Sequence, residues 1–335
     1  MQRKAPSMGK TLAIIALTAV LLSAMGGSTK LAGQGDEGLT IVVTFPFIKG
    51  DVELIATCEG DSVLSLVPPG VDPHDYQLTP KDLQVLASAD VIISTAHTHF
   101  ETEIKNMKLS GELKGILIEI PSIENITLLR IPSSGTVNYH GMLFHGDNYA
   151  VFVRYLAKVL ESLRPECAHE YENSVDNVLD RIGNISSFKP LKGVNVVIDS
   201  PTIQYLAAWL GANVSHIVMV EHDVPLTPGD IDKVESILAS YGQNAMVLVL
   251  EDSPARNILE DLASNYGAGL VTVSNPLVYP DSIIQYLETV VSALTAPQTS
   301  GTEASAHDKI DIVSILAVSM FLIGVVLIVY LRSRR

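Results

Sequence analysis

The chain has 335 residues, of which 47% are hydrophobic and 18% charged, and its formal net charge is −15. This charge argues against nucleic acid and anionic bilayer surfaces as partners, because both would repel it. It suits a cation as ligand, and the length is enough for two domains of ordinary size.

The N-terminal end, residues 1–33, is predicted to be a secretory signal peptide. Arg3, Lys4 and Lys10 precede the uncharged apolar run Thr11–Ala24, and small residues follow it. This order is typical of a signal peptide, and the run is too short to span a bilayer comfortably. The body of the protein is therefore expected to be exported.

Residues 39–164 are predicted to form a first α/β lobe, because short apolar strands alternate with helical segments. Such alternation builds a parallel sheet covered by helices on both faces. Thr79 and Pro80 are suited to the N-cap and first position of a helix. The expected elements are a strand at Leu39–Phe45, a helical stretch to Thr57, a strand at Ser62–Val67, a helix from Pro80 and a strand at Val91–Ser94.

One histidine, His74, lies in the loop after the second of these strands, in the segment "LVPPGVDPHDY". Ligands of parallel α/β sheets bind outside the carboxyl ends of the strands. Prolines restrict the loop and fix the imidazole in advance, which favours metal ligation. The alternative is a loop histidine that is hydrogen-bonded to the backbone.

The alternating histidines His97 and His99, with Glu101, follow the predicted strand Val91–Ser94 at every second residue. At this period they could share one face and collect metal ions at the surface. The simpler interpretation is that all three are solvated loop residues. Of the other histidines, His169 and His307 are interpreted as incidental. His216 starts a predicted strand, and His222, between two acidic residues, is expected to form a salt bridge.

A single amphipathic helix, residues 165–188, is predicted to connect the first lobe to a second one. From Pro165 to Gly183 apolar residues recur at three- and four-residue spacing. Beyond it the alternation restarts, and residues 193–294 form the second lobe, with a binding cleft expected between the lobes. The expected strands are Val194–Ile198, His216–Val220, Met246–Leu250 and Gly269–Val273, and the expected helices are Pro201–Leu210, Pro228–Tyr241, Pro254–Tyr266 and Asp281–Leu294.

The C-terminal end is predicted to anchor the protein in a membrane. Residues 295–309 have the composition of a flexible stalk, and Ile312–Leu331 contains no charge. A helix of about 20 residues covers the ~30 Å hydrocarbon core. The arginines of the tail, residues 332–335, favour the cytoplasmic side. The predicted location is the cell membrane, with a single pass, an extracellular body and a cytoplasmic C-terminus.

The chain has two cysteines, Cys58 and Cys167. Outside the cell they could form one disulfide. Nothing in the sequence places the two residues together, so the pairing stays open.

Enzyme motifs are absent from the sequence. It has no Gly-x-Ser-x-Gly elbow, no Walker loop, no His-Glu-x-x-His helix and no Gly-x-Gly-x-x-Gly after the first strand. We predict that the protein is not an enzyme and has no catalytic or cofactor-binding residues. Any ATP-driven transport would need another subunit.

Leu66–Ser94 resembles the first ligand motif of the zinc/manganese ABC-transporter solute-binding proteins, the cluster A-I (cluster 9) receptors. The shared features are Gly-x-x-x-His, an aromatic residue, Thr-Pro, and Ala-Asp before a strand. The similarity continues at Glu101, Glu221–Val234 and Val247–Val273. The family's fold, two α/β lobes bridged by one long helix, agrees with the pattern above. The resemblance implies a receptor, expected to be monomeric, that delivers zinc or manganese as transported ligand to an ABC permease and its ATPase.

The resemblance also implies four metal ligands. The first matches His74, and the second best matches His140, with His145 as its competitor. The third and fourth positions fall on Ser200 and Asn275, which are not the ligand types of the family. Two of the four positions have therefore changed, both in the second lobe.

The changed positions leave the expected site without a negative charge, which makes it a poorer site for a divalent ion. Asp199, next to Ser200, or Glu251, at the end of a strand, could supply a carboxylate, and water could complete the coordination. If the metal site has been lost, two alternatives remain. One is a receptor of the same fold for another solute, such as a metal chelate. The other is a surface adhesion or scaffold protein.

Overall fold

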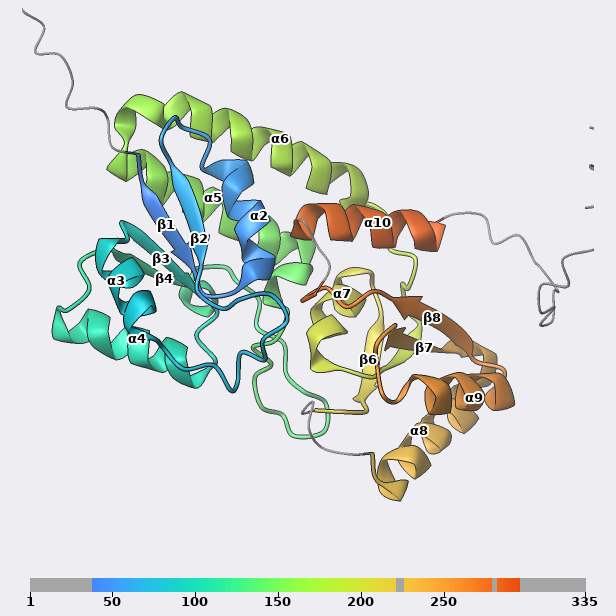
Figure 1. The fold of residues 1–335 in the computed structure, drawn as a ribbon. Helices are drawn as coiled ribbons and strands as arrows, with labels where there is room; N and C mark the ends of the chain where they lie inside the picture. The colour runs from blue at the N-terminus through green and yellow to red at the C-terminus, as the bar shows by residue number, and fades with distance from the viewer. Residues whose placement is uncertain (1–37, 221–225, 279–281, 296–335) are drawn as a thin grey trace, which may run out of the picture. The chain divides into compact units, whose positions relative to one another are not determined.

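The computed structural model describes residues 38–220, 226–278 and 282–295 (Figure 1). In that part of the chain, no helix is both long enough and apolar enough to cross a membrane. The predicted signal peptide, transmembrane span and cytoplasmic tail lie outside the described residues, as do His222, His307 and all of the stalk except Thr295.

The first lobe contains a parallel sheet of four strands in the order β2-β1-β3-β4. Its central strands are runs of valine and isoleucine, and Ile41, Val42, Ile92 and Ile93 are fully buried. Strands covered on both faces are expected to be continuously apolar in this way. The strands are β1 Thr40–Val43, β2 Ser62–Ser65, β3 Val91–Ser94 and β4 Ile116–Glu119.

Helices cover both faces of this sheet, as expected. In Figure 1, α2, α5 and α6 lie on one side and α3 and α4 on the other. Thr79 and Asp82 form a reciprocal capping box at the start of α3, with Pro80 at the first helical position. No element was predicted between residues 95 and 164, where the structure has α4, β4 and α5. The helices are α2 Pro46–Ile55, α3 Pro80–Ser88, α4 His99–Ser110, α5 Gly146–Leu163 and α6 Ala168–Ser186.

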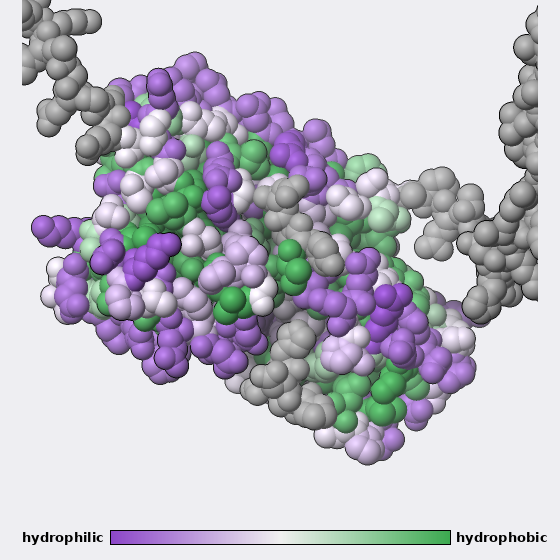
Figure 2. Space-filling view, viewed as in Figure 1, coloured by the Kyte–Doolittle hydropathy of each residue, from purple (hydrophilic) through white to green (hydrophobic). Residues whose placement is uncertain are grey.

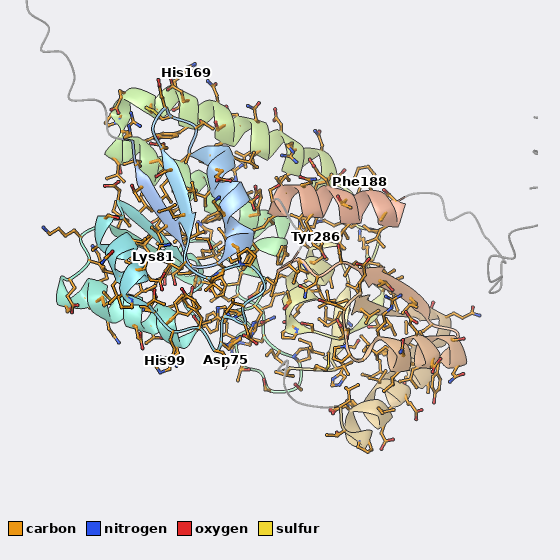
Figure 3. All side chains as sticks on the ribbon, viewed as in Figure 1. Asp75, Lys81, His99, His169, Phe188 and Tyr286 are labelled. Carbon is orange, nitrogen blue, oxygen red and sulfur yellow. A yellow bond between two sulfur atoms is a disulfide. The ribbon has the colours of Figure 1, made fainter. Side chains whose placement is uncertain are left out.

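The helix α6 corresponds to the predicted connector, but it begins later than predicted. Pro165–Cys167 forms a 3-10 turn, and the α-helix follows from Ala168 to Ser186. Its apolar stripe is buried, whereas the outer side is polar in Figure 2. His169 lies on that outer side and is exposed (Figure 3), as expected for an incidental residue.

The second lobe repeats the topology of the first, with a parallel sheet in the order β6-β5-β7-β8. Two parallel-sheet lobes are therefore confirmed. The strand β6 begins three residues earlier than predicted, because pairing with β5 starts at Asn213, soon after a left-handed turn at Gly211. The elements are β5 Asn195–Ile198, α7 Gln204–Trp209, β6 Asn213–Ile217, α8 Pro228–Tyr241, β7 Ala245–Leu250, α9 Arg256–Tyr266, β8 Gly269–Val273 and α10 Ile283–Thr295.

The last helix, α10, packs back on the first lobe. The backbone N–H of Ile283 donates to Asp51 Oδ2 at 2.7 Å, and Tyr149 donates its hydroxyl to Asp51 Oδ1, also at 2.7 Å. Arg181 of α6 forms a two-pronged ion pair with Glu288 of α10. These contacts tie the end of the second lobe to α2, α5 and α6.

The two cysteines, whose pairing the sequence leaves open, form a disulfide. Cys58 follows α2 and Cys167 ends the turn before α6, 109 residues further along the chain. The bond closes a large loop that contains most of the first lobe.

Candidate metal centre

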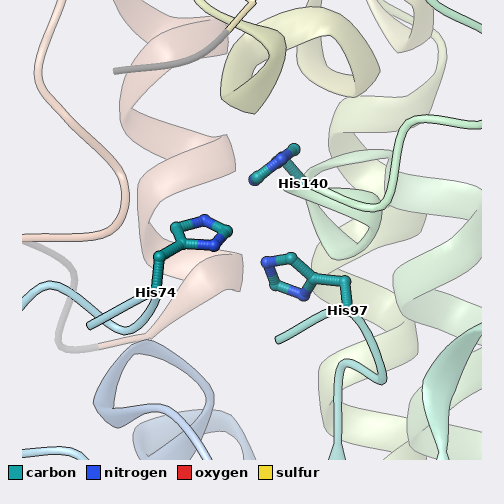
Figure 4. A group of neighbouring side chains, drawn as sticks. All are labelled: His74, His97 and His140. Atoms are coloured by element: carbon teal, nitrogen blue, oxygen red, sulfur yellow. The ribbon is translucent and has the colours of Figure 1, made fainter. Parts of the chain in front are cut away.

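Three histidines, His74, His97 and His140, converge at one place in the structure (Figure 4). One ring nitrogen from each lies within 4.8 Å of the other two. His74 follows β2 and His97 follows β3, so both lie beyond the carboxyl ends of strands. The order of the first sheet reverses between β1 and β3, the position where open α/β sheets bind ligands.

The loop that carries His74 is held at both ends. The backbone N–H of His74 donates to Asp72 Oδ1 at 2.8 Å, which closes a local turn. The Tyr76 hydroxyl lies 2.9 Å from Asp82 Oδ2 and 3.1 Å from the carbonyl oxygen of Leu66. The loop is therefore fastened to the end of β2 and to the cap of α3.

The buried carboxylate of Glu101 organises the loop that carries His97. Glu101 is 2% exposed and accepts backbone N–H groups of Thr95, His97 and Thr98 at 2.7 to 3.1 Å. It also accepts the hydroxyl of Thr44, which follows β1, at 2.7 Å. One carboxylate thus joins the ends of two neighbouring strands to the start of α4.

The sequence interpretation of His97 and Glu101 as solvated loop residues is wrong. The side chain of His97 is 12% exposed and that of Glu101 is not exposed at all. The physical reason is the capping box at the start of α4: the Glu101 carboxylate folds back to accept the backbone N–H groups of His97 and Thr98, which holds both side chains inside. His99 does point outward, with 85% of its side chain exposed (Figure 3).

A threonine fixes the proton of His97. The Thr95 hydroxyl lies 2.9 Å from the Glu101 carboxylate and 2.7 Å from His97 Nδ1. Its single hydrogen is donated to the carboxylate, so its oxygen accepts the Nδ1 hydrogen of the imidazole. This tautomer leaves Nε2 unprotonated, with a lone pair that can bind a metal ion.

His140 is held by a buried asparagine at the junction with the second lobe. Its backbone N–H donates to Asn138 Oδ1, and Asn138 Nδ2 donates to the carbonyl oxygen of Pro201, both at 2.8 Å. The Tyr205 hydroxyl of α7 donates to the Asn138 carbonyl oxygen at 2.6 Å and accepts the N–H of Leu129 at 2.9 Å. Elements of the second lobe therefore help to position His140, which is itself a residue of the first lobe.

Burial keeps two of these imidazoles neutral. It lowers the pKa of His140 to about 4, helped by the neighbouring His97 and His74. Burial also lowers the pKa of His97, against the opposing effect of Glu101. For Glu101, burial acts to raise the pKa, but the interaction with the neighbouring His97 ring and the hydrogen bonds donated to the carboxylate outweigh it, and the pKa is lowered. The rings of His97 and His140 are thus neutral, and the carboxylate of Glu101 is ionised.

The candidates of the second lobe have other contacts. Ser200 caps the turn at Pro201–Ile203, and Asn275 donates to Asp252 Oδ2 at 3.0 Å. Glu251 is exposed. Asp199 is fully buried; it accepts the N–H of Leu250 at 3.1 Å, and burial raises its pKa. Among the described His, Cys, Asp and Glu residues, the group that could hold a metal ion contains neither Asp199 nor Glu251.

His145, the competitor of His140, lies elsewhere. It precedes α5 and lines a cavity of about 370 Å³ together with Asp147, Lys189, Lys192 and Trp209. Its Nδ1 is buried and has no hydrogen-bond partner in the described part of the chain. Two lysines make this cavity a poor place for a cation.

Two parallel-sheet lobes, with histidines beyond the strand ends of one lobe, define a two-lobed solute-binding protein. The sequence profile of the zinc-uptake complex component A periplasmic family (ZnuA) matches residues 41–296. The chain belongs to this family, whose members are substrate-binding receptors of ABC transporters and not enzymes.

Individual relatives are distant and differ in the metal that they are named for. The manganese ABC transporter substrate-binding lipoprotein PsaA of Streptococcus pneumoniae is 22% identical over 75% of this chain and 85% of its own. The iron-binding protein YfeA of Yersinia pestis is 24% identical over 69% of this chain and 76% of its own. The binding protein FpvC of Pseudomonas aeruginosa, solved with Ni²⁺, has a TM-score of 0.60 at 22% identity, covering 80% of this chain and all of its own.

Proposed function

We propose that this protein is an extracellular, membrane-anchored receptor that captures a divalent transition metal and delivers it to an ABC importer. The observation that carries the proposal is the convergence of His74, His97 and His140. Membership in the zinc-uptake family and the metals in the names of its relatives support it. The permease and its ATPase would be separate subunits, because the sequence has no Walker loop.

The spacing of the three histidines fits an ion after a small contraction. Nitrogens bound tetrahedrally at about 2.1 Å from zinc lie ~3.4 Å apart. In the structure the corresponding nitrogens are within 4.8 Å of one another. Each side chain would move by about 1 Å, which rotation about side-chain bonds supplies without refolding the loops.

Two features support export and a C-terminal anchor. The disulfide Cys58–Cys167 is typical of an oxidising compartment outside the cytosol. Several relatives are named lipoproteins, but both cysteines of this chain are paired, so neither thiol is free for a lipid. The uncharged segment Ile312–Leu331 would take the place of the lipid, with the arginine-rich tail inside the cell.

Calorimetric titration tests the proposal. The full chain, purified in detergent and stripped with chelator, is titrated with Zn²⁺ and with Mn²⁺. We expect saturable binding of one ion per chain, abolished in His74→Ala and in His140→Ala, and unchanged in the exposed variant His169→Ala.

No saturable binding to the wild-type chain would overturn the metal receptor. The protein would then be either a receptor of the same fold for another solute, such as a metal chelate, or a surface adhesion or scaffold protein. A chelate would raise the melting temperature when added, and a scaffold would respond to no small ligand.

A further inference from the structure

We infer that His97 is the third metal ligand of the proposed receptor, and that the protein ligands are three histidines, with no side chain from the second lobe. This inference rests on the proposed function and names the metal class that the site selects. His97 stands 4.9 Å from His140 and 5.5 Å from His74, measured between ring centroids. No other described residue with a metal-binding imidazole, thiolate or carboxylate joins the group.

The backbone before His97 is strained in a way that serves this geometry. Ala96 has φ +57°, in the left-handed region that residues with a side chain rarely adopt. Such a conformation costs about 1 kcal/mol or more, and persists only where surrounding contacts impose it. Here the Ser94 hydroxyl accepts the N–H of Ala96 at 3.0 Å, and Glu101 accepts that of His97 at 3.0 Å. The turn presents the His97 ring to the other two.

Glu101 supplies the negative charge that the changed positions Ser200 and Asn275 do not. Its Oε2 lies 3.6 Å from His97 Nδ1, and Thr95 connects the two groups. A carboxylate behind a ligating histidine raises the basicity of the ring and fixes its orientation. Glu101 is therefore a positioning residue, which acts on the ion through His97.

A site of three imidazoles prefers particular metals. Imidazole suits zinc, copper, nickel and iron, whereas manganese prefers carboxylate and water oxygens. Three histidines also leave the fourth tetrahedral position of zinc open. The site therefore selects zinc-like ions over manganese. The open position would allow a ligand from a transport partner to coordinate the ion.

Zinc titrations of matched variants test this inference in the full chain. We expect His97→Ala to weaken zinc binding by more than about 100-fold, because losing even an outer partner of a ligand costs 10–100-fold. His99→Ala, two residues away and exposed, is the matched control and should change the affinity by less than about threefold. Asp199→Asn and Glu251→Gln should change the zinc affinity as little as the control does.

Two further readouts do not depend on the folding of a variant. X-ray absorption of the zinc-loaded wild type should count three imidazoles and no protein carboxylate. Competition in the wild type should favour zinc over manganese by at least about 100-fold.

In Glu101→Gln, zinc affinity should fall by about 10–100-fold while three imidazoles remain bound.

The inference and the proposed function fail in different ways. Zinc binding that is lost in His74→Ala and His140→Ala, but kept in His97→Ala, overturns the inference and leaves the receptor standing. A carboxylate in the absorption spectrum, loss of binding in Asp199→Asn, or equal affinity for manganese also overturns it. A wild-type chain that binds no metal overturns both.

Discussion

Two buried carboxylates, Asp51 and Glu101, show how the surroundings of one residue decide its charge. Glu101 accepts three backbone N–H groups and several hydroxyls, so its ionised form is stabilised although it is buried. Asp51 is fully buried with fewer donors, and burial raises its pKa to about 6. Hydrogen bonds from Ile283 and Tyr149 oppose this rise but do not cancel it.

The raised pKa of Asp51 gives the protein a stability that depends on pH. The pKa of Asp51 in the folded protein is about 6, above the ordinary value of 3.8. Its contribution to the free energy of unfolding is therefore fully present below pH 4 and is lost as the pH rises through 6. Between pH 4 and pH 7 the wild type should lose up to about 3 kcal/mol relative to Asp51→Asn. Urea unfolding at several pH values measures this difference.

The exposed variant Asp180→Asn, on α6, is the control for this experiment. Its free energy of unfolding should change with pH in the same way as that of the wild type. If the wild type and Asp51→Asn also ran parallel, Asp51 would not titrate between pH 4 and pH 7 in the folded protein.

The elements of the fold were predictable where one local pattern decides them. Alternating apolar strands, the Thr79–Pro80 cap and the stripe of α6 were all found from the sequence. The segment between residues 95 and 164 was not predicted, although α5 buries a periodic apolar stripe like that of α6. The positions of its two site histidines depend on contacts with distant residues. His97 turns inward because Glu101 reaches Thr44, 57 residues earlier, and His140 is placed by Asn138 and α7.

The sequence did contain one local signal for this inward turn. Thr98 and Glu101 have the spacing of a capping box, which predicts a helix start and a buried glutamate. The period-two interpretation of His97 and His99 hid that signal. His74 was selected from its loop after a strand as well as from the resemblance, and His140 from the resemblance alone. Their roles as ligands stay a prediction.

A contact between elements should control the position of His140. Tyr205→Phe removes a hydroxyl that serves both Leu129 and Asn138, leaving a buried N–H and a carbonyl without this partner. We expect a loss of about 2 kcal/mol of stability and roughly 10-fold weaker zinc binding. Denaturant unfolding and calorimetry measure the two effects. Tyr155→Phe, on the exposed side of α5, should change neither, and unchanged zinc affinity in Tyr205→Phe would separate His140 from this network.

The disulfide connects two other elements, the end of α2 and the turn before α6. The cysteines are 109 positions apart in the sequence and can separate in a reduced unfolded chain, so the bond stabilises the fold by restricting that chain. The double variant Cys58→Ser/Cys167→Ser should lose about 2–5 kcal/mol of unfolding free energy. Reducing agent should bring the wild type to the same stability and leave the variant unchanged. A wild type indifferent to reductant would show that the bond contributes nothing.

At the scale of the whole molecule, the proposal joins a binding body to a membrane through its C-terminal segment. The helix α10 is fastened to the first lobe by Asp51 and Arg181, so the predicted stalk begins at a firmly held point of the body. Tethering restricts the receptor to a thin layer near its permease, which raises the effective concentration of the pair. The net charge of −15 adds repulsion from anionic lipid, so the body should not adhere to the surface by itself.

A truncated chain tests this anchoring. A chain that ends at Thr295 should be released into the medium or the periplasm, whereas the full chain should stay in membranes after an alkaline wash. The expectation follows from the loss of the uncharged segment Ile312–Leu331, which is long enough to span the ~30 Å core. Replacing the three tail arginines by serine is the matched control, since it changes the orientation signal and keeps the apolar segment. If the truncated chain remained in the membrane, the anchor would lie at the other end, in an apolar Thr11–Ala24 run that is not cleaved.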